Sequence, residues 1–260
     1  MNTLQSSGHA PINGINMYYE IHGEGSIPLV LIHGGGSTIE TNFSAIIPIL
    51  SKKNKLIAVE LQAHGRTSDR DTPESFEQDA DDVIGLLKYL KIDKANFFGF
   101  SNGGTTTLRI AIKYPEMVNK IIVASGAVKR EGFINGFFEF MPNATLNDMP
   151  MPLQEGYLKL TPDRNGLLAM FTKDRDRMVG FTDWPDEELK SIKAPSMFMV
   201  ADHDVITVEH TLDMSRLISN APLAVLPGAH GTYIGEVCSM KEGSTQPLVT
   251  CILIEEFLNG

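Results

Sequence analysis

Apolar residues follow two rhythms along the chain, one typical of buried strands and the other typical of amphipathic helices. Six short and almost uninterrupted apolar runs occupy residues 28–32, 55–59, 95–99, 120–125, 196–201 and 221–226. Strands that helices cover on both faces have this composition. Between and after these runs, helical spacing of apolar residues occurs at 75–90, 104–113 and about 248–258. The alternation predicts an α/β fold with a doubly wound, mostly parallel sheet, whose ligand crevice lies beyond the carboxyl ends of the strands.

Two segments depart from this alternation. Residues 12–23, interrupted by Asn13-Gly14, predict a hairpin at the edge of the sheet. Residues 129–184 contain no strand-like run but carry more Phe and Met than a solvated loop would. We therefore predict a core domain formed by residues 1–128 and 185–260, with residues 129–184 inserted as a helical cap, or lid. Within the cap, the side chains expected to line the substrate pocket are those of Phe137, Phe138 and Met141.

The most informative motif is Gly99-Phe100-Ser101-Asn102-Gly103, which lies between an apolar strand and a helix. This is the pattern of a nucleophile elbow, a sharp strand-to-helix turn that exposes a nucleophilic side chain. Glycine suits the two outer positions because a Cβ would clash in so tight a turn. Ser101 then stands at a helix N-terminus, where free amides and the helix dipole favour developing negative charge.

A glycine-rich loop, His33-Gly34-Gly35-Gly36, follows the apolar run at 28–32 and reaches the same edge of the sheet. Acyl transfer needs two donors for the tetrahedral oxyanion, usually the amide after the nucleophile and one from this loop. We expect the amides of Asn102 and Gly35, with Gly34 as the alternative. His33 is expected to hold the loop by hydrogen bonds.

Residues 29–124 resemble the core of the α/β-hydrolase superfamily, specifically its carboxylesterase-like branch with a cap between the sixth and seventh strands. In that family the nucleophile, the acid and the histidine follow one another along the chain. The resemblance assigns the acid to Asp204, after the run at 196–201, with Asp202 as the alternative. It assigns the general base to His230, in the loop after the last strand. The predicted triad is therefore Ser101, Asp204 and His230, in which a neutral imidazole takes the serine proton and a carboxylate orients the imidazole.

A second loop, residues 60–68, resembles the family's Asp-x-Arg-Gly-His-Gly-x-Ser motif. Glu60 and Gln62 stand in place of the Asp and the Arg, so the ion pairing inside this loop is expected to differ. The resemblance implies a structural role for His64.

Composition narrows the possible partners. The chain of 260 residues has a net charge of −10, which argues against a nucleic-acid or anionic-membrane surface and favours a small-molecule substrate. No metal-site spacing, dinucleotide fingerprint or P-loop occurs, so we expect neither a metal nor a cofactor. The N-terminus has no leader pattern and no apolar run approaches the ~20 residues of a membrane span, which predicts a cytoplasmic location. Cys238 and Cys251 are expected to be buried thiols, with a disulfide between them left open, and the oligomeric state leaves no signal in the sequence.

These features predict a serine hydrolase that cleaves a carboxylic ester of a small molecule through an acyl-enzyme. A carbon–carbon bond hydrolase or an amidase of the same fold would use nearly the same residues, so both stay as alternatives. A non-catalytic ligand receptor is the alternative from another class, because a fold does not by itself establish activity.

Overall fold

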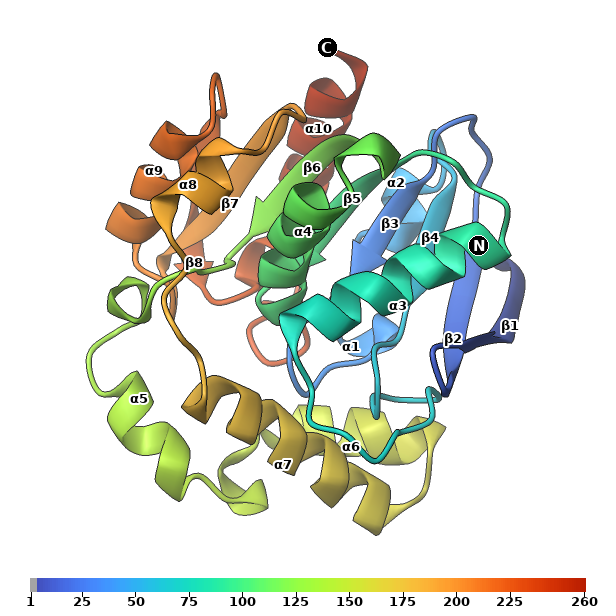
Figure 1. Ribbon diagram of the computed structural model, residues 1–260, viewed down its shortest axis with the longest axis vertical. Coiled ribbons are helices and arrows are strands. Elements are labelled where there is room, and N and C mark those ends of the chain that lie inside the picture. Colours follow the sequence, from blue (N-terminus) through green and yellow to red (C-terminus); the bar gives the residue numbers. More distant parts are fainter. Residues whose placement is uncertain (1–3) are drawn as a thin grey trace.

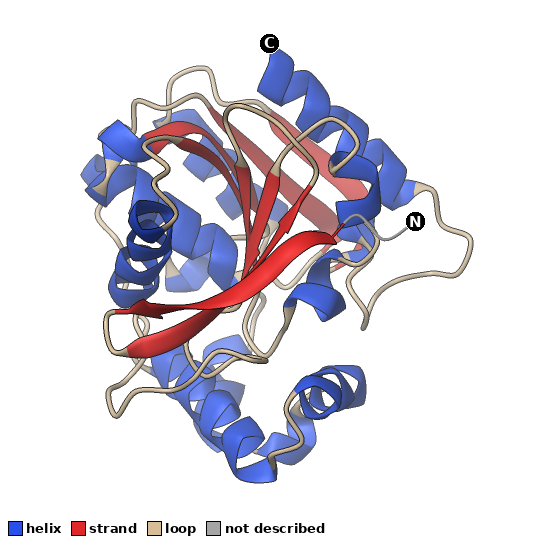
Figure 2. Ribbon diagram, turned by 90° about the vertical axis from the view of Figure 1, so that its right-hand side faces the viewer, coloured by secondary structure: helices blue, strands red, loops and turns tan. Residues whose placement is uncertain are grey.

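The computed structural model describes residues 4–260, which form one eight-stranded sheet with helices on both faces (Figures 1 and 2). The strand order is β1-β2-β4-β3-β5-β6-β7-β8. The strands are β1 (Leu4–Ile12), β2 (Ile15–His22), β3 (Leu29–Ile32), β4 (Leu56–Val59), β5 (Ala95–Phe100), β6 (Val118–Ala124), β7 (Ser196–His203) and β8 (Leu223–Ala229). Strand β2 pairs antiparallel with β1 at one edge and with β4 on its other side, and the six strands β3 to β8 are parallel to one another. The predicted α/β fold and its mostly parallel sheet are confirmed.

Helices cover the two faces of the sheet, and the sheet separates two apolar cores. On one face lie α3 (Phe76–Tyr89), α4 (Asn102–Lys113), α8 (Asp186–Lys190) and α9 (Val208–Leu217). On the other lie α1 (Ile39–Phe43), α2 (Ile47–Leu50) and α10 (Gln246–Asn259). Short 3₁₀ turns add η1 (Pro115–Met117), η2 (Arg130–Gly132), η3 (Met141–Asn143), η4 (Leu146–Asp148) and η5 (Thr232–Ile234).

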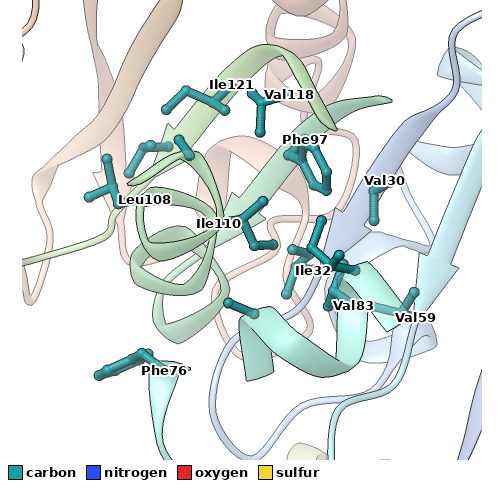
Figure 3. Close-up of a cluster of buried hydrophobic side chains, with 14 of the residues drawn as sticks. Val30, Ile32, Val59, Phe76, Val83, Phe97, Leu108, Ile110, Val118 and Ile121 are labelled. Atoms are coloured by element: carbon teal, nitrogen blue, oxygen red, sulfur yellow. The ribbon is translucent and has the colours of Figure 1, made fainter. Parts of the chain in front are cut away.

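The larger core explains why the short strand runs are uninterruptedly apolar. Figure 3 shows Val30, Ile32 and Phe97 on adjacent strands, facing Val83 of α3 and Ile110 of α4. All five side chains are fully buried. Burying a side chain of this size stabilises the fold by about 1.5–3 kcal/mol. The sheet that carries the site is therefore held rigidly from both faces.

Residues 129–184, called the cap segment below, fold as helices. They contain α5 (Phe137–Phe140), α6 (Met151–Leu160) and α7 (Arg164–Val179), together with η2, η3 and η4 and no strand. In Figure 1 these helices lie at the bottom, below the ends of the strands. The cavity that the cap segment helps to line also touches the loops after β3, β5, β7 and β8. The cap segment therefore faces the carboxyl ends of the parallel strands.

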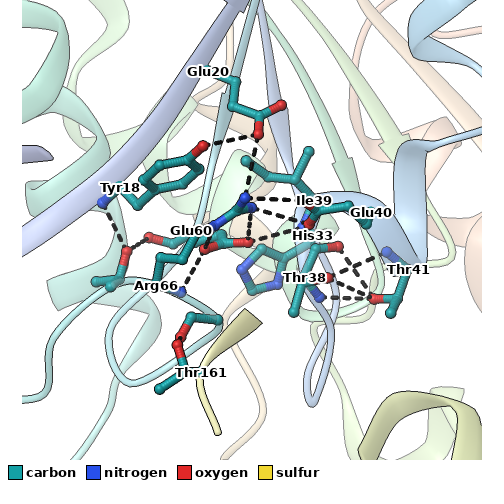
Figure 4. Close-up of polar contacts among 12 residues, drawn as sticks. Tyr18, Glu20, His33, Thr38, Ile39, Glu40, Thr41, Glu60, Arg66 and Thr161 are labelled. Atoms are coloured by element: carbon teal, nitrogen blue, oxygen red, sulfur yellow. Dashed lines mark hydrogen bonds and ion pairs between the residues drawn. The ribbon is translucent and has the colours of Figure 1, made fainter. Parts of the chain in front are cut away.

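A buried ion pair shapes the loop after β4, where Glu60 and Gln62 depart from the family motif. Arg66 donates from Nη2 to Glu60 Oε1 at 2.6 Å and from Nε to Glu60 Oε2 at 3.0 Å (Figure 4). The Arg66 backbone amide also donates to Glu60 Oε2, at 2.7 Å. The pair fixes the turn at Gly65 and so sets the position of His64 beside the glycine-rich loop.

The cysteines are not bonded to each other. Cys251 is buried, as expected, whereas Cys238 is exposed and the expectation of a buried thiol was wrong there, since it sits in an irregular loop after η5 rather than in the core. Among the described residues, no helix combines the length and apolar character that a bilayer crossing requires.

Candidate active site

Ser101 occupies a strained turn between β5 and α4. Its backbone lies at φ 56° and ψ −122°, a region that non-glycine residues rarely adopt. A Cβ at Gly99 would come within 2.0 Å of the Gly103 carbonyl oxygen, and one at Gly103 within 2.1 Å of the Ile32 carbonyl oxygen. Only glycine fits at either position. This geometry is that of a nucleophile elbow, with Ser101 at the N-terminus of α4.

The structure places Asp204 beside His230. His230 Nδ1 lies 2.5 Å from Asp204 Oδ1, although the two residues belong to the loops after different strands. The Asp204 side chain is fully buried, whereas 26% of the His230 side chain is exposed. Because Nδ1 faces a carboxylate, Nε2 is the ring nitrogen left to act as a base. The rival acid, Asp202, instead accepts the Gly228 amide at 2.7 Å.

Two residues that the sequence did not reveal support the carboxylate. Ser125, directly after β6, donates its hydroxyl to Asp204 Oδ2 at 2.6 Å and lies 2.7 Å from the Tyr233 hydroxyl. Burial alone would raise the pKa of Asp204, but the His230 ring and the hydrogen bonds from Ser125 and the Ala201 amide hold it below its usual value. Asp204 is therefore ionised and fixed in orientation. The only sequence signal for Ser125 is a polar residue at the end of an apolar run.

Backbone donors surround the elbow, and they differ in availability. The Gly34 amide donates to Asn42 Oδ1 at 2.7 Å, and the Gly36 amide donates to Asp174 Oδ2 at 2.6 Å. Within residues 4–260, the amides of Gly35 and Asn102 have no acceptor. Gly35 packs against the Asn102 side chain, since a Cβ on Gly35 would lie 2.6 Å from Asn102 Nδ2. Of the two loop glycines weighed from the sequence, Gly35 is thus the one with a free donor.

Ser101 and His230 open into one cavity of about 310 Å³ between the sheet edge and the cap segment. Its wall is largely apolar, with contributions from Phe133, Phe137, Phe140, Met141, Met149, Leu153, Phe171, Met178 and Ile206. Phe137 and Met141 line it, and their contact with a substrate stays a prediction. Phe138 is outside the lining: it stacks on Phe181, with ring centroids 6.1 Å apart, and its ring lies under the Arg130 guanidinium. Phe137 therefore faces the cavity, whereas Phe138, the next residue of α5, packs toward the core.

No arrangement for a metal ion was found: within residues 4–260, no three or more His, Cys, Asp or Glu side chains are grouped to hold one.

Comparison with known proteins agrees with this geometry. A family described as "alpha/beta hydrolase fold" matches residues 27–161, just over half of the chain. The chain therefore belongs to the α/β-hydrolase fold family. Human serine hydrolase BPHL is 34% identical over 125 residues, which make up 46% of this chain and 43% of that protein. The match thus spans less than half of that relative's length.

Two further similarities extend over most of the chain. The uncharacterized hydrolase YugF of Bacillus subtilis (strain 168) is 27% identical over 225 residues, covering 75% of this chain and 80% of that protein. The crystal structure of the enol-lactonase from Burkholderia xenovorans LB400 aligns with a TM-score of 0.75 at 20% identity, over 97% of this chain and 100% of that one. At this identity the second similarity shows the fold alone.

Proposed function

We propose that the protein is a serine hydrolase that cleaves a carboxylic ester of a small molecule through an acyl-enzyme. The observation that carries the proposal is that the candidate catalytic groups meet at one cavity. Ser101 at the elbow and His230, which is paired with Asp204, border one apolar cavity, and Gly35 and Asn102, whose amides have no acceptor among the described residues, line the same cavity.

The reaction follows from the roles of these groups. Ser101 Oγ attacks the ester carbonyl carbon while His230 Nε2 takes the hydroxyl proton and Asp204 stabilises the resulting imidazolium. The amides of Gly35 and Asn102 donate to the oxyanion of the tetrahedral intermediate. The carbon–oxygen bond to the alcohol then breaks, and Nε2 returns its proton to the leaving alkoxide. Water, deprotonated by the same nitrogen, attacks the acyl carbonyl carbon. The bond from this carbon to Ser101 Oγ then breaks, Nε2 returns the proton to Oγ, and the carboxylic acid leaves.

The cavity indicates the kind of ester. Its volume of about 310 Å³ and its Phe and Met wall suit a small substrate with an apolar acyl or alcohol part. The cap segment acts as the lid over the cavity, so its helices set which substrates fit. Two unpaired cysteines fit a cytoplasmic enzyme, because reducing compartments keep thiols free.

The test is turnover of p-nitrophenyl acetate and butyrate, beside matched thioester, anilide and vinylogous diketone substrates. We expect release of p-nitrophenol by the wild type and loss of at least about 10³-fold in kcat for Ser101→Ala with unchanged folding. Faster turnover of the diketone or the anilide than of every ester would shift the proposal to a carbon–carbon bond hydrolase or an amidase. No turnover of any substrate would favour a receptor.

A further inference from the structure

Asp174 is a buried carboxylate that reaches from the cap segment into the two loops of the proposed oxyanion hole. It lies on α7 and is 9% exposed. Its Oδ2 accepts the Gly36 amide at 2.6 Å and lies 2.9 Å from His64 Nε2. Its Oδ1 accepts from Asn102 Nδ2 at 3.4 Å and from the Arg177 guanidinium. No role for this residue follows from the triad.

The acceptors around the His64 ring favour its charged form. His64 Nδ1 faces the Gln62 carbonyl oxygen at 2.7 Å and Nε2 faces Asp174 at 2.9 Å, so both nitrogens meet acceptors and both carry protons. Burial alone would lower the pKa of His64, but the Asp174 charge outweighs it and the pKa rises to about 9. The Gly36 amide also points to His64 Nε2, at 3.2 Å, but the shorter hydrogen bond is the one that it donates to Asp174 Oδ2, at 2.6 Å.

The other histidine of this region, His33, is neutral. Its Nδ1 donates to the Gly34 carbonyl oxygen at 2.7 Å, and its Nε2 accepts the Leu61 amide at 3.0 Å. Burial lowers the pKa of His33 to about 3, in agreement with this bonding. The peptide group between Gly34 and Gly35 is thus fixed by His33.

The next peptide group, between Gly35 and Gly36, has its shortest hydrogen bond to Asp174, at 2.6 Å. Its other contacts are longer: 3.2 Å from the Gly36 amide to His64 Nε2, and 3.4 Å from the Ser37 hydroxyl to the Gly35 carbonyl oxygen. Gly35 joins these two peptide groups, and its N–H has no acceptor among the described residues. A lone carboxylate here would repel an oxyanion, but Asp174 is balanced by the charged His64 and Arg177. Arg177 is in turn held by Asp79 at 2.7 Å.

We propose that Asp174 is a positioning residue that assembles the oxyanion hole from the cap segment, by holding the Gly36 peptide and the Asn102 side chain in place while α7 is docked. This rests on the proposed function of the site. It makes α7 part of the catalytic geometry as well as a wall of the cavity: the free amide of Gly35 is aimed only when the cap segment is seated.

The experiment compares Asp174→Asn and Asp174→Ala with the wild type by steady-state ester hydrolysis. Asn keeps one acceptor for the Gly36 amide but loses the charge, whereas Ala loses both. We expect kcat to fall about 10-fold for Asn and about 100-fold for Ala, with KM changed less than about threefold, since loss of one oxyanion donor costs on the order of 10²–10³. The control Asp213→Asn removes the same charge from an exposed site on α9 and should keep wild-type kcat.

Hydrogen–deuterium exchange gives a readout that does not need turnover. Peptides spanning residues 33–38 should exchange faster in Asp174→Asn than in the wild type or Asp213→Asn. This arm uses the Asn variant, so it stands even if Asp174→Ala does not fold. Unchanged exchange, or faster exchange with wild-type kcat, would overturn the positioning role. If the wild type hydrolyses no ester, the proposed function fails by itself, and the exchange result alone decides whether Asp174 holds the loop.

Discussion

The backbone of Ser101 is held in a conformation that costs of order 1–3 kcal/mol, and its surroundings supply what keeps it there. The Ser101 amide donates to the Ala124 carbonyl oxygen at 2.8 Å, and its own carbonyl oxygen accepts the Gly104 amide, also at 2.8 Å. With Gly99 and Gly103 leaving room for close backbone contact, the strain serves to present the hydroxyl to the cavity. We therefore expect Ser101 to contribute to the proposed chemistry more than to stability.

We predict that Asp204, and not its neighbour Asp202, is the acid that supports His230. Asp204→Asn should lower kcat by orders of magnitude, because an amide facing His230 Nδ1 favours the wrong tautomer. Asp202→Asn should change kcat less than about threefold, because Asp202 supports only the Gly228 amide. Both are measured by ester hydrolysis at saturating substrate, with circular dichroism as the folding control. The reverse ranking would move the acid to Asp202.

At the scale of elements, α5 presents neighbouring side chains to different surroundings. Phe137 lines the cavity beside Met141 of η3, while Phe138 stacks on Phe181. Periodicity could not separate Phe137 from Phe138, because α5 has only four residues and follows Gly136 in a left-handed conformation. A helix this short has no apolar stripe that a sequence pattern could define.

This difference predicts two kinds of cap variant. Phe137→Ala and Met141→Ala should shift the preference between p-nitrophenyl acetate and longer acyl esters toward longer chains, because each enlarges the cavity. Phe138→Ala should keep the wild-type preference and instead lower the free energy of unfolding by about 1–3 kcal/mol, since it removes packing. Chain-length profiles and urea unfolding measure the two effects. A wild-type profile in both cavity variants would contradict the lid role of this segment.

At the scale of the whole molecule, buried charges join the cap segment to the core. Burial raises the pKa of Glu74 to about 8, and the pKa of His64 is about 9. Asp174 and Arg177 of α7 face both groups, with Asp79 of α3 beside Arg177 and His33 against His64. Glu74 and His64 each keep a proton in the folded state that the unfolded chain releases at lower pH.

Both pKa shifts make the folded state less stable as the pH rises. The contribution of His64 to stability is complete below its unfolded pKa of about 6.5 and is lost as the pH rises through about 9, and Glu74 acts in the same direction from about 4.5 to 8. The free energy of unfolding should therefore fall by roughly 3–5 kcal/mol between pH 6.5 and 9.5. Urea unfolding across this range measures it, with Glu74→Gln expected to reduce the slope. A flat or rising profile would contradict the charge assignment.

The sequence predicted the fold well because each central strand is buried on both faces and each main helix has an apolar stripe. It missed most of β1, which begins at Leu4, because an edge strand with polar Gln5 and Ser6 has no apolar run. It also missed Asp174, whose partners His64 and Gly36 lie 110 and 138 residues away. In sequence, Lys173 to Arg177 has the alternating charge of a solvated helix face, and only tertiary packing makes it a buried link.

The mass of the acyl-enzyme tests most directly whether Ser101 is the nucleophile. The protein is mixed with excess p-nitrophenyl butyrate, quenched in acid within the first turnover, and measured by intact-protein and peptide mass spectrometry. We expect one butyryl group per chain, located on Ser101, and none on Ser101→Ala. In His230→Ala the group should accumulate only if Ser101 can still be acylated without the base. Turnover with the acyl group on another residue, or undiminished turnover by Ser101→Ala, would contradict it.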